Sequence, residues 1–269
     1  MELDSYLSEK QKKKKRLRKY LLFATVFMVV YAIAVGVAWT FLRSPIFKAN
    51  AIVVTGNQTV SSGDVITLLQ STTLRDHNFI KSLMGFKNML IWPDALGAAD
   101  LRLIPQIATL TTSKSYLSQT ITVKVTERMP FAIWCVAPQA EEKCYWFDDT
   151  GTAFRRTFDT QGSLMFAIHD YSQSDPGLNG KILPSPFVDN LISIVNVVRE
   201  SGVDIKEIAL KDIGLQEIDL TTYNGPDVYF SLRFPADNDL GVLQSLMAKP
   251  TFGKLQYVDF RVENRAYYK

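Results

Sequence analysis

Three sets of residues in this 269-residue chain have types and spacings that suit chemistry. The first is Asp149-Thr150-Gly151, which matches the Asp-Thr-Gly signature of aspartic proteases. Those enzymes share a proton between two carboxylates, and the chain has one copy of the motif, so catalysis would require a homodimer to supply the second. The alternative, which we favour, is structural. Asp-x-Gly is typical of the turn of a hairpin, here between Tyr145–Phe147 and Thr152–Arg155.

The second set is the two cysteines, Cys135 and Cys144. If Phe131–Val136 and Lys143–Phe147 form a hairpin centred on residues 139–140, the cysteines lie opposite each other on neighbouring strands. Opposed Cα atoms in such a pair are about 4.5–5.5 Å apart, which permits a disulfide, and an oxidising compartment favours one. Two separate thiols, one or both of them buried, are the alternative.

The third set is the two histidines, His77 and His169. Neither belongs to a His-Glu-x-x-His pattern, and paired Cys-x-x-Cys motifs are absent from the sequence, so we predict no metal site. The sequence also lacks Ser-x-x-Lys, Gly-x-Ser-x-Gly and a Walker A loop. We therefore predict no catalytic residue and no cofactor.

The elements that hold these residues begin with a membrane segment. Leu21–Leu42 is an uncharged apolar run, and its 22 residues would span roughly 33 Å as a helix, enough to cross a hydrocarbon core of about 30 Å. Tyr20 and Trp39 suit the two interfaces. A cleaved signal peptide has a shorter apolar core and a small-residue cleavage site, and a buried core helix is seldom apolar on every side. We therefore predict a transmembrane helix at 21–42.

Charge predicts the orientation of this helix. Residues 1–20 contain eight lysines and arginines against three acids, a charge of +5, which leaves −2 for the rest of a chain whose formal charge is +3. The positive-inside rule places this basic tail in the cytoplasm and the remainder outside, as a single-pass type II protein of the plasma membrane. The slightly acidic remainder has no electrostatic footprint for nucleic acid.

The first 80 or so residues after the membrane predict a compact α+β unit. A strand at Ile52–Val54 is followed by a helix from Ser61, with an apolar stripe. Pro93 suits the first turn of a second helix that buries Leu96, Ala99, Leu101 and Leu103. Two strands, Ile107–Thr112 and Thr120–Thr126, complete the unit.

The pattern changes near residues 128–130, and mostly strands follow. One helix with a clear helical period is predicted at Pro186–Glu200, and it ends at Ser201-Gly202. A further helix is predicted near Leu240–Ala248. The predicted strands include Ile205–Leu210, Leu215–Leu220, Val228–Arg233 and a last strand, Leu255–Val262. The predicted division is therefore a tail at 1–20, the helix at 21–42, an α+β domain at 45–128 and a mainly antiparallel β domain at 129–269.

Three stretches resemble the FtsQ/DivIB family of cell-division proteins. Phe47–Asn57, with a helix start at Val60-Ser61, resembles the opening of a POTRA domain. Ile121–Trp134, which contains Glu127-Arg128-Met129-Pro130, is similar to the strand that closes that domain, and Tyr145–Gly151 follows as it does in the family. Leu255–Val262 resembles the family's final strand. The match covers nearly the whole chain in order, except residues 76–88 and 162–214, to which the resemblance assigns no role.

The resemblance implies a non-enzymatic scaffold at the division septum. It implies recruitment through the POTRA domain, and binding of two small bitopic partners with coiled-coil segments through the β domain. A last strand without a successor would be a sheet edge that accepts a partner strand. We therefore expect a partner-binding edge over Val258–Val262, in which Tyr257, Asp259 and Arg261 share one face and Val258, Phe260 and Val262 the other, with Tyr267 nearby. An ordinary solvated edge is the alternative.

Two other functions are left open by the sequence. A membrane-anchored extracytoplasmic hydrolase that uses Asp149 would need a second catalytic carboxylate, for which the sequence offers no partner. A POTRA protein of envelope secretion would be expected to carry repeated POTRA units or a barrel, and the sequence shows no internal repeat.

Overall fold

The computed structural model describes residues 2–75, 79–137, 143–158, 165–172 and 175–269, with the backbone alone at 2–15, 41–43 and 79–80. The chain divides into two compact units. The first contains residues 1–55, 61–96 and 111–124, and the second contains residues 56–60, 97–110 and 125–269.

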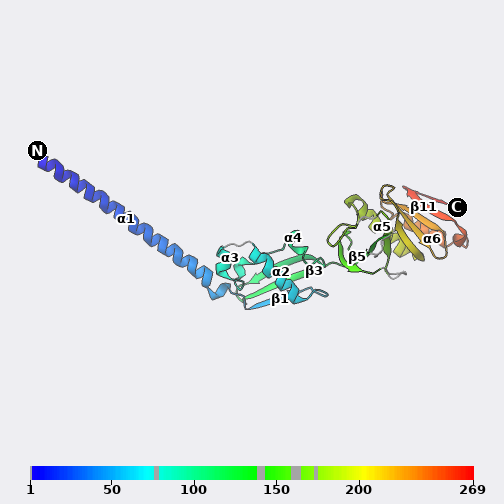
Figure 1. The fold of residues 1–269 in the computed structure, drawn as a ribbon, viewed down its shortest axis with the longest axis horizontal. Helices are drawn as coiled ribbons and strands as arrows, with labels where there is room; N and C mark the ends of the chain where they lie inside the picture. The colour runs from blue at the N-terminus through cyan, green and yellow to red at the C-terminus, as the bar shows by residue number, and fades with distance from the viewer. Residues whose placement is uncertain (1, 76–78, 138–142, 159–164, 173–174) are drawn as a thin grey trace. The chain divides into compact units, whose positions relative to one another are not determined.

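A single long helix, α1, runs from Glu2 to Arg43 at the start of the first unit (Figure 1). Its segment Arg16–Thr40 is long and apolar enough to cross a membrane, and none of it is buried within the protein. The predicted apolar helix is therefore present. It extends back through the basic tail because lysine and arginine are good helix formers. A membrane anchor and a signal sequence share these features.

Beyond α1, the first unit contains most of a three-stranded sheet of order β1-β3-β2. β1 (Ala51–Thr55) runs parallel to β3 (Thr120–Glu127), and β2 (Ile107–Ser115) lies on the other side of β3. Helix α2 (Ser62–Arg75) starts where the Ser61 hydroxyl accepts a hydrogen bond from the Asp64 amide at 3.1 Å. The apolar stripe of α2 is buried through Val65, Leu68 and Leu69. The short helices η1 (Pro45–Phe47), α3 (Phe79–Met84) and η2 (Met89–Ile91) complete this unit.

The helix predicted to start at Pro93 is wrong in position and length. The structure has α4, a single turn at Ala98–Leu101, and extended backbone before it. The Asp94 carbonyl accepts a hydrogen bond from the Thr112 amide at 2.8 Å, so this backbone is engaged with β2 and is not free to form a helix. Leu101 is buried as expected, whereas Leu103 is 61% exposed.

The second unit is built on a nine-stranded sheet of order β12-β11-β10-β9-β8-β7-β4-β5-β6. Three pairings are parallel (β4–β7, β7–β8 and β10–β11) and the other five are antiparallel, so the sheet is mixed and mostly antiparallel. Its strands are β4 (Ala132–Val136), β5 (Lys143–Phe147), β6 (Ala153–Thr157), β7 (Ala167–Asp170), β8 (Ile205–Leu210), β9 (Glu217–Thr222), β10 (Asp227–Ser231), β11 (Tyr257–Val262) and β12 (Arg265–Tyr268).

Helices α5 (Ser185–Ser201) and α6 (Asp239–Met247) pack on one face of this sheet (Figure 1). The 3-10 turn η3 (Phe252–Lys254) precedes β11. Helix α5 ends at Gly202, whose φ of +71° is the left-handed cap that the sequence predicts. The core between helices and sheet includes Trp134, Phe147, Phe230, Phe260, Leu191 and Leu243. Among the described residues no helix contributes to the apolar cluster on the opposite face, which we call the outer face.

Candidate partner-binding edge and outer face

The free edge of the sheet lies one strand beyond the place that the sequence predicts. β11 pairs with β10 on one side and with β12 on the other, so Val258–Val262 is an interior segment. The chain reverses at Asn264, whose φ of 58° lies in the left-handed region that asparagine tolerates. The expectation of an edge at Val258–Val262 is therefore wrong, and the terminal strand is β12.

β12 presents alternate backbone groups to solvent. The Lys269 amide donates to the Tyr257 carbonyl at 3.3 Å, which points this amide toward β11. Because the backbone alternates along a strand, the amides of Ala266 and Tyr268 point away from β11. Tyr267 and Tyr268 are 47% and 52% exposed. This edge has the donors and the exposed aromatic rings that an added strand would contact.

The other predicted partner-binding residues take different places. Val258 and Phe260 are buried in the core beneath the helices, while Tyr257, Asp259 and Arg261 alternate onto the outer face. Val262 is 46% exposed and does not join the core, because the register with β12 shifts between Asp259 and Val262. Of the predicted residues, Tyr267 alone lies on the edge strand.

Arg261 is the centre of a bonded group on the outer face, which we call the Arg261 cluster: Glu217, Tyr229, Asp259 and Arg261. Nε and Nη2 of Arg261 donate to the two oxygens of Asp259 at 2.9 and 2.7 Å, and Nη1 donates to Glu217 at 2.9 Å. The guanidinium also lies 4.9 Å from the ring centre of Tyr229. Arg261 is thus already paired in the free protein.

The electrostatics of the cluster follow from these contacts. The hydrogen bonds from Arg261 hold the pKa of Asp259 below its ordinary value despite burial. Burial raises the pKa of Tyr229, and the charges of Asp227 and Asp219 raise it further. Lys211 pairs with Asp219 at 2.7 Å, and this hydrogen bond raises the pKa of Lys211. At neutral pH Asp259 is therefore a carboxylate held by Arg261, while the Tyr229 hydroxyl keeps its proton, and the bonds of the cluster give a partner ordered side chains to pack against.

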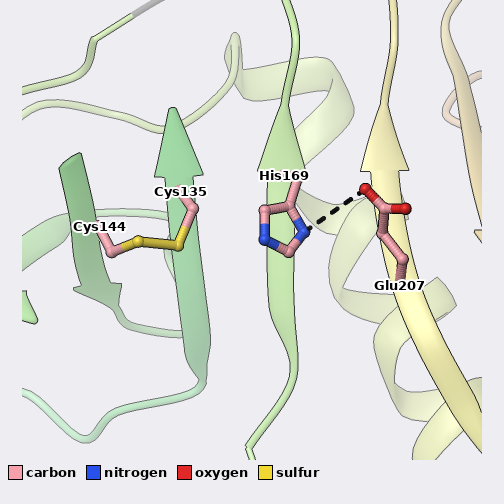
Figure 2. The surroundings of a disulfide bond; sticks show 4 residues. All are labelled: Cys135, Cys144, His169 and Glu207. Atoms are coloured by element: carbon pink, nitrogen blue, oxygen red, sulfur yellow. Dashed lines mark ion pairs between the residues drawn. A yellow bond between two sulfur atoms is a disulfide. The ribbon is translucent and has the colours of Figure 1, made fainter. Parts of the chain in front are cut away.

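The cysteines also lie on the outer face, on strands β4 and β5, toward the end of the sheet that is opposite β12 (Figure 2). Cys135 on β4 is opposite Cys144 on β5, their Cα atoms are 4.1 Å apart, and the structure joins them in a disulfide. His169 on β7 is next to Cys135, and its Nδ1 lies 4.0 Å from Glu207 Oε1 on β8. Both cysteines are buried, with Ile133 beside them. In the structure this pair therefore serves as a cross-link between β4 and β5.

The Asp-Thr-Gly motif forms the turn between β5 and β6, and the turn interpretation is confirmed. The organising carboxylate is Asp148, one residue before the motif. Its Oδ1 accepts hydrogen bonds from the amides of Thr150 and Thr152, each at 3.0 Å. Gly151 has a φ of +70°, and a side chain there would meet Val188 at 2.7 Å. Asp149 is exposed on this turn.

Two neighbouring charged residues, Glu127 and Arg128, hold two turns. Glu127 accepts hydrogen bonds from the amides of Gln58, Thr59 and Val60 at 2.7 to 3.0 Å. Arg128 Nη1 donates to Asp148 Oδ2 at 2.5 Å, and the Arg128 Nε donates to the Pro105 carbonyl at 3.1 Å. Sequence reasoning singled out Glu127-Arg128 by resemblance. It included Asp148 only within the resembling segment Tyr145–Gly151 and did not identify it as the partner of Arg128.

Metal binding has no candidate in the part of the chain that the structure describes, where no three His, Cys, Asp or Glu side chains converge. His77 lies outside the described residues. Comparison of the sequence with models of known protein families and with curated proteins found no match.

Proposed function

We propose that this chain is a non-enzymatic scaffold of the bacterial division machinery, anchored in the plasma membrane by α1. In this proposal it binds the extracytoplasmic segments of small bitopic partners by adding one of their strands to β12. The observation that carries the proposal is the position of β12 as the last strand of the sheet, paired on one side only among the described strands. Such an edge accepts an extended segment through main-chain hydrogen bonds.

Three further observations support it. The apolar span of α1 suits an anchor, and the basic tail favours a cytoplasmic N-terminus. Two of the motifs that resemble FtsQ/DivIB proteins have a clear structural role. Glu127 and Arg128 hold turns by hydrogen bonds, and Tyr145–Gly151 forms β5 and the turn after it. The Arg261 cluster beside the edge supplies tyrosine and arginine, the residue types that dominate many interfaces.

The division role is tested by localisation. A fluorescent protein fused to the N-terminus should form a band at midcell in dividing cells, and the band should be lost when residues 45–128 are replaced by an unrelated domain. A fusion with the complete chain that labels the envelope evenly throughout the cell cycle would contradict the division role.

The edge is tested by one substitution and its matched control. Ala266→Pro removes an amide that points away from β11, so it leaves the β11–β12 pairing in place, as prolines on edge strands do. Ala266→Ser keeps that amide. We expect Ala266→Pro to abolish co-purification of the full-length protein with the small bitopic division proteins of the same cells, and Ala266→Ser to retain it. Equal recovery of the partners with both variants would contradict strand addition at β12.

A further inference from the structure

The turn between β2 and β3, residues 116–119, holds apolar side chains in solvent. Leu117 at its tip is 103% exposed and Tyr116 is 41% exposed. An isolated exposed leucine is ordinary on a protein surface. Here two adjacent apolar side chains, Tyr116 and Leu117, are exposed at the tip of a tight turn, where polar residues are usual. This exposure favours a partner surface that covers the turn.

Hydrogen bonds tie this turn to the segment that directly follows α1. The Gln119 side chain donates to the Pro45 carbonyl at 2.7 Å, and the Asn50 amide donates to the Gln119 carbonyl at 2.7 Å. The Tyr116 ring stands edge-on to the Phe47 ring, with 5.8 Å between ring centres. The turn is therefore joined to residues 45–50 by these hydrogen bonds and a ring contact.

Those residues lie close to the end of the apolar span. The Ser44 amide donates to the Thr40 carbonyl at 2.8 Å, which continues the last turn of α1 to the start of η1. Ile46 on η1 is 58% exposed. Pro45 is five positions beyond Thr40 in the chain, so the two residues are at most about 17 Å apart even if the chain between them is extended. Ile46, and the turn that Gln119 bonds to Pro45, are thus tethered close to the end of the span.

The surroundings suit a lipid surface. Lys48 and Lys87 are exposed beside the same segment, where the Ala49 amide donates to the Lys87 carbonyl at 2.7 Å. Their ammonium groups can meet lipid phosphates, while tyrosine and leucine are favourable at the boundary between headgroups and acyl chains.

We propose that Ile46, Tyr116 and Leu117 form a lipid-binding cap that enters the interface of the bilayer which α1 crosses. The inference rests on the membrane anchoring in the proposed function, and it is independent of the division role. The bilayer is the occupant because the covalent link to α1 keeps the cap at the membrane surface whether or not another protein is present.

The test places an environment-sensitive NBD fluorophore on single cysteines. Both native cysteines are in the disulfide, so labelling without reductant modifies the introduced thiol alone. Leu117→Cys reports on the cap, and folding is unaffected because Leu117 is fully exposed. Lys124→Cys is the matched control, because Lys124 is exposed on β3, four residues (about 13 Å) beyond Thr120. Val29→Cys, within the span, reports on the anchor.

The full-length protein is placed in phosphatidylcholine–phosphatidylglycerol vesicles with and without a lipid that carries a nitroxide high on its acyl chain. We expect blue-shifted emission and loss of most intensity to the nitroxide at position 117, and neither at 124. Emission from position 117 that equals that in water, with position 29 in lipid, would overturn the cap and leave the anchor intact. Blue-shifted but unquenched emission at 117 would show protein cover and also overturn it. Water-like emission at 29 would overturn the anchor itself.

Discussion

At the scale of single residues, Glu127 should stabilise the protein in a pH-dependent way. Burial alone would raise its pKa, but hydrogen bonds from the Thr59 hydroxyl and from the amides of Val60, Gln58 and Thr59 outweigh burial and lower the pKa to about 2, from 4.5. The folded form therefore favours the carboxylate. The stabilisation is complete above pH 4.5 and is lost as the pH falls from there through about 2.

We expect Glu127→Gln to reduce the free energy of unfolding at pH 7 by about 1–2 kcal/mol, after allowance for solvent screening. Melting curves of the full-length protein in detergent at pH 7 and pH 3 measure the effect. The gap in Tm between wild type and variant should narrow at pH 3. Glu263→Gln, at an exposed position, is the control. A difference in Tm that is the same at both pH values would contradict the lowered pKa of Glu127.

Asp239 should act in the opposite direction. It is 9% exposed at the start of α6, and burial, followed by the charge of Asp237, raises its pKa to about 6, from 3.8. The folded form therefore favours the neutral acid. Its favourable contribution is present below pH 3.8 and is lost as the pH rises through about 6.

We expect Asp239→Asn to increase the free energy of unfolding at pH 7 by about 1–3 kcal/mol, because an amide removes the buried charge. At pH 4 the variant and wild type should melt at nearly the same temperature. Asp237→Asn, at an exposed position, should shift Tm much less. A lower Tm for Asp239→Asn at pH 7 would show that the carboxylate has a stabilising role.

Residue roles were predictable from the sequence where a local pattern determines them. Gly202, the left-handed cap of α5, is an example. It was predictable because a helical apolar stripe that is followed by a glycine is enough to place such a cap. The role of Asp148 depends on Arg128, 20 residues earlier in the chain, and no local pattern contains that pairing. The same limit applies to the hydrogen bond between Arg261 and Glu217, which are 44 residues apart in the chain.

At the scale of elements, the β4–β5 hairpin should depend on its disulfide. Cys135 and Cys144 are separated by 9 residues, and closing a loop of about that length should stabilise the folded state by roughly 2–3 kcal/mol. We expect Cys135→Ala/Cys144→Ala to lower Tm, and a reductant to lower the Tm of wild type to a similar value. The double variant should be insensitive to reductant. An unchanged wild-type Tm, with mass spectrometry showing both thiols reduced, would contradict this role.

Most elements were predictable because their periodicity is strong. Strand β8 lies where the sequence placed it, at Ile205–Leu210, and α5 differs from Pro186–Glu200 by one residue at each end. The misses are short elements with weak patterns. β7 and β12 have four residues each, too few to show alternation, and β12 is recognisable only from its pairing with β11. The helix at Pro93 failed because pairing with β2 overrode the local proline signal.

At the scale of the whole molecule, the charge of the tail should fix which side of the membrane each end occupies. Eight basic residues precede the span and two, Arg43 and Lys48, follow within 20 residues of it. The positive-inside rule counts such residues near the ends of a span. We therefore expect a new cysteine at Ser8 to be protected from a membrane-impermeant maleimide in intact cells, and one at Lys269 to be labelled.

Removing that asymmetry should randomise the orientation. Replacing the basic residues at positions 10 and 12–16 by glutamine leaves Arg18 and Lys19 before the span, against two basic residues after it. We expect labelling at both Ser8→Cys and Lys269→Cys in this background, because neither orientation is then favoured. Lysine-to-arginine changes at positions 10 and 12–15 keep the charge and should keep position 8 protected. If the neutralised tail remains protected and position 269 remains fully labelled, the large folded portion after the span decides the topology, and the tail does not. A cleaved signal sequence is distinguished by labelling after the cells are permeabilised, because a protected thiol at position 8 then reacts, whereas a thiol removed with a signal sequence is missing from the mature protein.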